Sequence, residues 1–424
     1  MHLVKQLPAG LRALRHANFR MFISGQACTQ IGMWLQLITT SWLMYRLSGS
    51  SFLLGVATFA LQVPFLLVSP VAGVFLDRME VRRVLLVTNA VVLAQAMAVL
   101  LLVATGAIQP WHLIVANLVL GIANACDAPA RQTLVARLVD KPDLANAIAL
   151  NAIMMNGARF IGPMVGGGLI AAIGELGSFA LNGMLRIPVL GALARLRLAD
   201  RDRPAAGGGD GGLASEFLAG ARYAYGFLPS RNLLLLVAAT SLSIQAYLPL
   251  MPWFAAERFA GGSDALGILL SAGGLGALTG MVYLALRPTV VGLFRLVGRT
   301  SALAGASLAA FSFTTDFWLG VALLYLTGMG AILTASASNT LLQTIVPDPL
   351  RSRVAALYLV SFLGVSPFGA LASGWIAEHV GAPQAMMMCG AFTLAAAGLY
   401  VCGLPSLRRA IRPVYEQLGI STAR

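Results

Sequence analysis

Residues 73–83, GVFLDRMEVRR, place three arginines and two carboxylates between two long apolar segments, 52–76 and 84–105. A loop this short turns the chain straight back, so we expect the two segments to form antiparallel neighbouring helices. Lys and Arg concentrate on the cytoplasmic side of a membrane, which puts the loop at that surface. We expect Gly73 to let two helix backbones approach closely, Asp77 to cap or pair, and the arginines to face lipid phosphates or helix ends.

The composition of the 424-residue chain is that of a protein dissolved in lipid. Hydrophobic residues make up 58% and charged residues 11% of the sequence, and the mean hydropathy is +0.80. Soluble domains carry about 25% charged residues, so a water-soluble core cannot absorb this much apolar sequence. The net charge of +13 comes mostly from arginines in loops, without a basic face interleaved with aromatic residues. We therefore expect membrane lipids as a partner, and no nucleic acid.

These features predict an all-α polytopic membrane protein with twelve transmembrane helices in two six-helix bundles, since about 20 apolar residues cross a bilayer. The predicted spans are 20–45, 52–76, 84–105, 111–136, 145–173, 178–197, 231–257, 264–286, 296–314, 317–346, 353–379 and 383–404. The predicted domains are an amphipathic cytoplasmic N-terminus (1–19), a first bundle (20–197), a cytoplasmic linker with a surface helix (198–230), a second bundle (231–404) and a cytoplasmic tail (405–424).

Charge counting assigns the orientation, and an internal repeat relates the two halves. Of the 29 lysines and arginines, 25 fall on the side that holds both chain ends. The termini are therefore expected in the cytoplasm of a multi-pass protein of the bacterial inner membrane. A shift of 207 residues superposes Gly121 on Gly328 and Gly157 on Gly364. Such parallel repeats are typical of transporters in which two bundles rock around a central site.

Three charged residues inside predicted spans are candidates for proton coupling or cargo binding: Asp127, Arg131 and Arg159. An ionised carboxylate in hydrocarbon must pair, face water or take up a proton, so Asp127 is a coupling candidate. Arg131 lies four residues on, on the same helix face, and a purely structural pair is the alternative. Arg159 either meets an anionic group of a cargo or bridges to a neighbouring helix. Arg186 is expected to pack or to reach the membrane surface.

Neutral polar residues form stripes on several predicted spans, where lipid would be an unsuitable neighbour. The candidates for lining a central cavity are Gln26, Gln30, Gln36, Asn151, Gln245, Tyr247, Asn339 and Gln343. Hydrogen bonds between helices are the alternative explanation for the same pattern.

The fifth span contains residues 157–168, GARFIGPMVGGG. Gly162 and Gly166 form a face that allows close helix packing, and Pro163 bends its own helix because it lacks a backbone donor. The core of Gly162, Pro163, Gly166 and Gly167 is similar to the fifth-helix motif of proton-coupled drug antiporters. The resemblance implies export, and a plain packing face is the alternative.

The loop at 73–83 resembles the signature of the major facilitator superfamily. The matching residues are Gly73, Asp77, Arg78, Arg82 and Arg83. The resemblance implies that Asp77 and Arg78 hold the two halves together in the outward-facing state. The segment from 121 to 159, the opening Phe19 and Arg20, and residues 367–369 are similar to one bacterial branch of that superfamily, which contains enterobactin exporters, macrolide efflux proteins and lysophospholipid transporters. This likeness covers nearly the whole chain.

The resemblance implies a secondary active transporter, and not an enzyme, that exports an amphiphilic organic compound such as a drug or siderophore as an antiporter. An importer or lipid flippase of the same fold is the alternative, and a polytopic membrane enzyme is less favoured. Neither Lys5 nor Lys141 lies in a phosphate-binding loop, so we expect no ATP and no cofactor, with the proton gradient as the energy source. The four histidines lie at predicted surfaces, which argues against an intramembrane metal centre. We expect a monomer that binds a small-molecule substrate.

Overall fold

The structure is a computed structural model that describes residues 9–76, 79–196, 213–287 and 289–417, and within these ranges it contains helices and no strands. After a short N-terminal 3₁₀ helix, η2 (Ala9–Arg15), the first half contains α1 (Ala17–Ser48), α2 (Ser51–Leu76), α3 (Val81–Ala104), α4 (Pro110–Arg137), η3 (Lys141–Asp143) and α5 (Leu144–Arg195). The predicted surface helix of the linker is α6 (Leu213–Gly226).

The second half is interrupted more often. Its elements are α7 (Leu228–Ile244), η4 (Gln245–Leu250), α8 (Met251–Trp253), η5 (Phe254–Arg258), α9 (Ser263–Ala285), α10 (Leu293–Phe311), α11 (Phe317–Ile345), α12 (Asp348–Leu359), η6 (Val360–Gly364), α13 (Ser366–Val380) and α14 (Ala382–Gln417). The elements η5 and η6 are π-helical turns inside longer helical segments.

Local sequence explains several helix ends. α1 ends at Gly49, whose φ of 61° favours glycine. At the start of α4 the backbone nitrogen of Gln109 donates to Nδ1 of His112 at 2.9 Å. At the start of α11 the carboxylate of Asp316 accepts a hydrogen bond from the backbone nitrogen of Leu319 at 2.6 Å, as an N-cap residue does.

α5 runs through two of the predicted spans and kinks between them. Gly174, inside α5, has φ 70° and ψ 179°, a backbone conformation that side chains other than hydrogen rarely allow. Space is open around the position that a Cβ atom of residue 174 would take, so the backbone conformation explains the glycine. The predicted spans 145–173 and 178–197 correspond to the two limbs of this single element.

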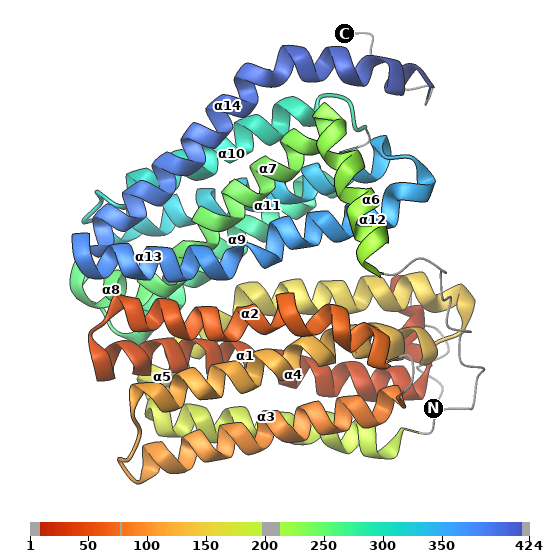
Figure 1. Cartoon of the computed structure of the whole chain (residues 1–424). Helices are drawn as coiled ribbons and strands as arrows, with labels where there is room; N and C mark the ends of the chain where they lie inside the picture. Colours follow the sequence, from red (N-terminus) through yellow and green to blue (C-terminus); the bar gives the residue numbers. More distant parts are fainter. Residues whose placement is uncertain (1–8, 77–78, 197–212, 288, 418–424) are drawn as a thin grey trace. The chain divides into compact units, whose positions relative to one another are not determined.

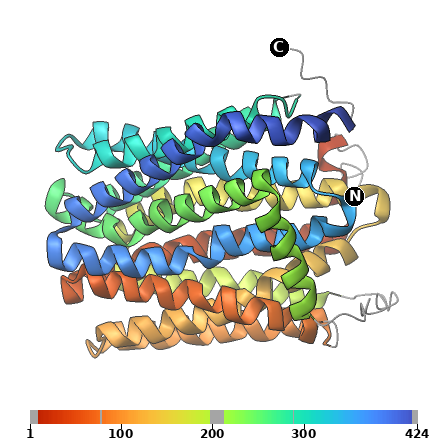
Figure 2. The same cartoon turned by 45° about the horizontal axis from the view of Figure 1, so that its top comes forward.

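The chain divides into two compact units. Unit 1 comprises Met1–Gly49, Ala60–Gly207 and Gly261–Ser271, and unit 2 comprises Ser50–Phe59, Gly208–Ala260 and Ala272–Arg424. In unit 1, α5 packs against α1 and α3, and α3 packs against α4 (Figure 1). In unit 2, α10 packs against α11 and α14 (Figure 2). Each unit buries its own cluster of aliphatic and aromatic side chains.

The helices suit a lipid environment. Nine stretches of the described residues are long and apolar enough to span a membrane. These nine stretches do not include α1 or α10, and they include both limbs of α5 as a single stretch. Counting α1, α10 and the second limb of α5 separately adds three. With these three additions the helices are consistent with the expected twelve spans. Large apolar side chains such as Leu101, Ile153 and Leu399 are more than half exposed, as lipid-facing residues are.

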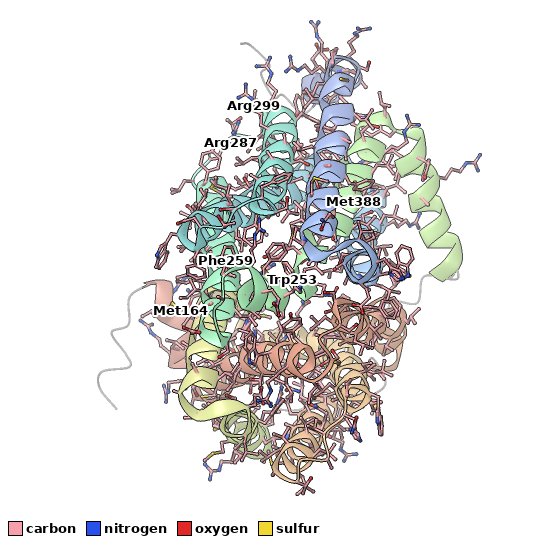
Figure 3. All side chains as sticks on the ribbon, turned by 90° about the vertical axis from the view of Figure 1, so that its left-hand side faces the viewer. Met164, Trp253, Phe259, Arg287, Arg299 and Met388 are labelled. Atoms are coloured by element: carbon pink, nitrogen blue, oxygen red, sulfur yellow. The ribbon has the colours of Figure 1, made fainter. Side chains whose placement is uncertain are left out.

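Arg287, Arg295 and Arg299 lie at the end of unit 2 where α9 ends and α10 begins. Figure 3 labels Arg287 and Arg299 at the outer edge of unit 2. The guanidinium group of Arg287 donates to the backbone oxygens of Thr289 and Val291, at 3.1 and 2.6 Å, so it fixes the loop between the two helices.

Candidate functional site

A pocket of about 260 Å³ lies inside unit 1, lined by α1, α2, α3, α4 and α5. Four of the predicted site residues line it: Gln26, Gln30, Asp127 and Arg131. Met33, Phe65 and Met155 contribute apolar wall. The pocket thus combines a few polar groups with an apolar lining, as small-molecule sites do.

Asp127 is held by three neighbours. Its Oδ1 atom accepts hydrogen bonds from Oγ1 of Thr88 at 3.3 Å and from Nδ2 of Asn89 at 3.1 Å. Its Oδ2 atom lies 3.7 Å from Nη1 of Arg131. The predicted Asp127–Arg131 pair along α4 is therefore confirmed, and two donors from α3 add to it. The side chains of Asp127 and Arg131 are 16% and 12% exposed, which leaves the carboxylate reachable from the pocket.

Arg186 contributes a second guanidinium group to the same pocket. The expectation that it packs is met, whereas a position at the membrane surface is wrong, because the residue is 3% exposed. Its Nε atom has no hydrogen-bond partner among the described residues. Sequence reasoning missed this contribution because the position in the second limb of α5 does not reveal which helix face turns inward.

Gln36 does not line this pocket. It is 1% exposed; its Nε2 atom donates to Oε1 of Gln95 at 2.8 Å, and its Oε1 atom accepts from Nδ2 of Asn182 at 2.9 Å. Three side-chain amides from α1, α3 and α5 therefore form one buried chain. The alternative explanation, hydrogen bonds between helices, holds for Gln36.

Arg159 and Asn151 on α5 are not among the residues that line the Asp127 pocket. Arg159 is exposed. Asn151 is half-buried, and its Nδ2 atom lies 3.9 Å from the sulfur of Met155. The Oδ1 atom of Asn151 is buried without a hydrogen-bond partner among the described residues. The structure thus joins Asp127 with Arg131, but not with Arg159.

The glycines of the fifth-span motif bring helices together. A Cβ atom on Gly162 would lie 2.5 Å from the Trp34 side chain, and one on Gly167 would lie 2.4 Å from the backbone oxygen of Ser263. One on Gly166 would lie 3.3 Å from the Ile38 side chain. α1 and α9 therefore approach α5 at these glycines, which confirms the expected close packing. Pro163 is buried within α5.

The loop signature is described in part. Gly73 lies in α2, whereas Asp77 and Arg78 lie outside the described residues. Arg82 donates from Nε to the backbone oxygen of Leu193 and from Nη2 to that of Ala194, both at 2.7 Å. Since these oxygens belong to the last turn of α5, the expectation that an arginine meets a helix end is confirmed.

Arg83 instead forms an exposed pair with Glu80, at 2.8 Å, within the same loop. An exposed pair between neighbouring turns contributes little to stability, about 0.3–0.5 kcal/mol. Of the two arginines, Arg82 is thus the one that joins separate helices.

The polar candidates of the second half lie in unit 2. They are Gln245 and Tyr247 on η4 and Asn339 and Gln343 on α11, and all four are half-buried. Tyr247 lies close to α9, because a Cβ atom on Gly273 would be 2.8 Å from the Tyr247 hydroxyl oxygen.

A second polar cluster in unit 1 was not expected from the sequence. Glu175 follows the kink in α5, is 8% exposed and pairs with Nη2 of Arg46 at 2.5 Å. The pair lines a cavity of about 320 Å³ together with Trp42 and Asp264. The Arg46 side chain is itself 62% exposed. The glycine before Glu175 is the signal that could have marked the turn that buries this carboxylate.

Comparisons with known proteins identify the family. Residues 9–415 match the family model of the transmembrane secretion effectors. A staphyloferrin A transporter of Staphylococcus aureus (strain NCTC 8325 / PS 47) is 22% identical over 379 residues, which cover 88% of this chain and 93% of that protein. The uncharacterised MFS-type transporter YfiS of Bacillus subtilis (strain 168) is 22% identical over 161 residues, 38% of this chain and 37% of that protein.

Solved structures share the fold. The nucleoside transporter NupG is 14% identical with a TM-score of 0.65, and the alignment covers 91% of this chain and 98% of that one. The POT family transporter PepTSo is 12% identical with a TM-score of 0.67 and coverages of 93% and 99%. The predicted superfamily is therefore confirmed, and the chain belongs to the transmembrane secretion effector family of major facilitator transporters.

Proposed function

We propose that this membrane transporter is a proton-coupled exporter of an amphiphilic organic compound. The observation that carries the proposal is Asp127, a carboxylate in a polar pocket between helices that suit lipid, with Arg131 as its partner. Protonation removes the charge of Asp127 and releases Arg131. A group whose charge changes in a low-dielectric site shifts the balance between two conformations.

The moving parts in this proposal are the two predicted bundles, 20–197 and 231–404, which open in turn to either side of the membrane. The proton gradient supplies the energy without ATP or another cofactor. The protein works as a monomer in the bacterial inner membrane with both termini in the cytoplasm. The family description of secretion, and the motif around Gly162 and Pro163, support the outward direction. The same family match supports a transporter over a polytopic membrane enzyme.

A second candidate, import by proton symport, is favoured by one specific observation. Two guanidinium groups, on Arg131 and Arg186, face one carboxylate, on Asp127, in the pocket. An anionic cargo would compete with ionised Asp127 for these cations, so cargo and proton would bind together. Ligands that favour one another's binding are carried in the same direction.

The test is proton movement in proteoliposomes that contain a pH-sensitive dye. Compounds for the assay are chosen by growth protection in a strain that lacks its main efflux pumps. A cargo gradient is imposed without a pH gradient. Exchange drives protons against the cargo, symport drives them with it, and cargo movement without protons contradicts both candidates. Asp127→Asn liposomes are the control, because the proton signal is expected to disappear in them.

A further inference from the structure

The Asp127 pocket carries a surplus of positive charge. Its charged lining residues are Asp127, Arg131 and Arg186, which give a net charge of one positive unit when Asp127 is ionised. The remaining polar groups that line it, among them Gln26, Gln30 and Asn124, are neutral. A charge in a membrane interior is costly unless a partner neutralises it.

Arg186 shares the charge of Asp127 with Arg131, but it forms no ion pair of its own within 4 Å among the described residues. The oxygens of Asp127 are taken, since Oδ1 accepts from Thr88 and Asn89 and Oδ2 faces Arg131. Arg186 is only 3% exposed, and its Nε atom has no hydrogen-bond partner among the described residues. A guanidinium group offers five donors in a fixed fork, which matches a carboxylate in geometry and charge.

We infer that the cargo is an organic anion whose carboxylate binds Arg186, with Arg131 as the second cation. The inference rests on the proposed function in that it takes this pocket as part of the cargo route. Because such an anion competes with ionised Asp127, the inference favours the second candidate, proton symport, over exchange. Met33, Phe65 and Met155 supply apolar wall beside the two arginines, so the anion also carries an apolar part. Neutralising the surplus charge of the pocket and satisfying the buried Nε atom both favour such a ligand.

An anionic lipid headgroup offers similar chemistry, and the experiment separates it from a free anion. The full-length protein is placed in nanodiscs of phosphatidylcholine alone and in nanodiscs that also contain phosphatidylglycerol. Binding of naphthoate is measured by titration calorimetry and compared with naphthamide, which has the same shape without the charge. A free anion as ligand predicts naphthoate binding in both lipids. Binding that phosphatidylglycerol abolishes would assign the site to lipid and overturn the inference.

The decisive variant is Arg186→Gln. Loss of a charge-assisted hydrogen bond is expected to weaken naphthoate binding by about tenfold or more. Arg186→Lys keeps the positive charge and is expected to retain part of the affinity, which shows that the folded pocket persists. Arg412→Gln is the matched control, since Arg412 is 75% exposed and pairs with Glu416 on α14. Asp127→Asn is expected to tighten naphthoate binding, because it removes the competing carboxylate.

Besides binding that phosphatidylglycerol abolishes, three further results would overturn the inference: naphthamide binding as tightly as naphthoate, no naphthoate binding to the wild-type protein, or unchanged naphthoate affinity in Arg186→Gln. Failure of the proposed function is distinguishable from these outcomes. In that case the proteoliposome assay shows no coupled proton movement while naphthoate still binds in an Arg186-dependent way.

Discussion

Asp127 on α4 and Thr334 on α11 are 207 residues apart, which is the spacing that relates the two halves of the sequence. Each is a polar side chain packed between helices, but the two find different hydrogen-bond partners. Asp127 takes donors from Thr88 and Asn89 and faces Arg131. Thr334 donates to the backbone oxygen of Gly330 in its own helix at 2.8 Å and pairs with the hydroxyl of Thr300 on α10 at 3.0 Å. The first position carries a charge, and the second is neutral.

This difference extends over the two units. Among the described residues, the buried charged side chains are Glu175 and Arg186, both in unit 1. Apart from the hydroxyls of three buried tyrosines, the buried polar side chains described in unit 2 are serine or threonine, for which the backbone oxygen one turn earlier is an available acceptor. Buried hydroxyls therefore fit a packed wall, whereas charges need partners from other helices. Among the described residues, the buried charges are thus concentrated in unit 1.

The largest effect is expected when a carboxylate is introduced at the matching position of unit 2. Thr334→Asp would bury a carboxylate at a position that is 0% exposed, beside Thr300 and without an arginine. An uncompensated buried charge costs about 3–5 kcal/mol, so we expect little folded protein. The measurement is the monodisperse fraction in size-exclusion chromatography after detergent extraction. Thr334→Val is the control and should elute like the wild type; normal elution of Thr334→Asp would contradict the comparison.

Removing the charge from unit 1 should abolish function and spare the fold. Asp127→Asn keeps the size of the side chain and its contacts with α3, but it can no longer take up a proton. Proton movement coupled to cargo is expected to fall to the level of liposomes without protein. The same preparation should unfold within a few degrees of the wild type. Coupled transport at the wild-type rate would remove Asp127 as the coupling residue.

A smaller effect is expected from the two loop arginines. Arg82 holds the end of α5 through two backbone oxygens, whereas Arg287 binds its own loop. Arg82→Gln loses two charge-assisted hydrogen bonds between separate helices and is expected to cost about 1.5–3 kcal/mol. Arg287→Gln should cost less, because a local contact constrains less of the chain. Thermal unfolding of both variants in one detergent measures the order, and a reversed order would be the contrary result.

The smallest effect is expected from the neutral counterpart. Thr300→Val removes the hydrogen bond to Thr334, which keeps its bond to the Gly330 oxygen. The expected cost is about 1 kcal/mol, without a change in transport. Thermal unfolding measures the stability cost, and the proteoliposome assay measures whether coupled transport is unchanged. A loss of coupled transport in Thr300→Val would show that unit 2 shares in the chemistry.

Most of the helices could be predicted from the sequence, because nine stretches of the described residues are long continuous apolar runs, which are stable as helices in lipid whatever helix lies beside them. The Asp127–Arg131 pair could be predicted as well, since a separation of four residues is fixed by the helix itself. Hydrogen bonds between side chains on different helices could not be predicted. Thr88 and Asn89 meet Asp127 because α3 is rotated toward α4, and one sequence does not specify that rotation.

The same limit explains the errors at single residues. Gln36 was expected in the cavity with Gln26 and Gln30, since all three share a helical sector of α1. It is instead satisfied by Gln95 and Asn182, whose closeness depends on the packing of three helices. Arg186 was expected to pack or to reach the surface, and packing alone decided that it lines the pocket.

The hydrogen-bonded amides of Asn182, Gln36 and Gln95 bear on whether protons can leak through unit 1. On α1, Gln36 lies between the stretch that lines the Asp127 pocket, which includes Gln30, and Arg46, the partner of Glu175. Side-chain amides carry hydrogen bonds but neither gain nor lose protons at physiological pH. A row of side-chain amides is therefore polar but does not pass protons on by protonation and deprotonation. These three side chains cross α1 between its Asp127-pocket stretch and Arg46, and none of the three can itself take up a proton held by Asp127 or Glu175.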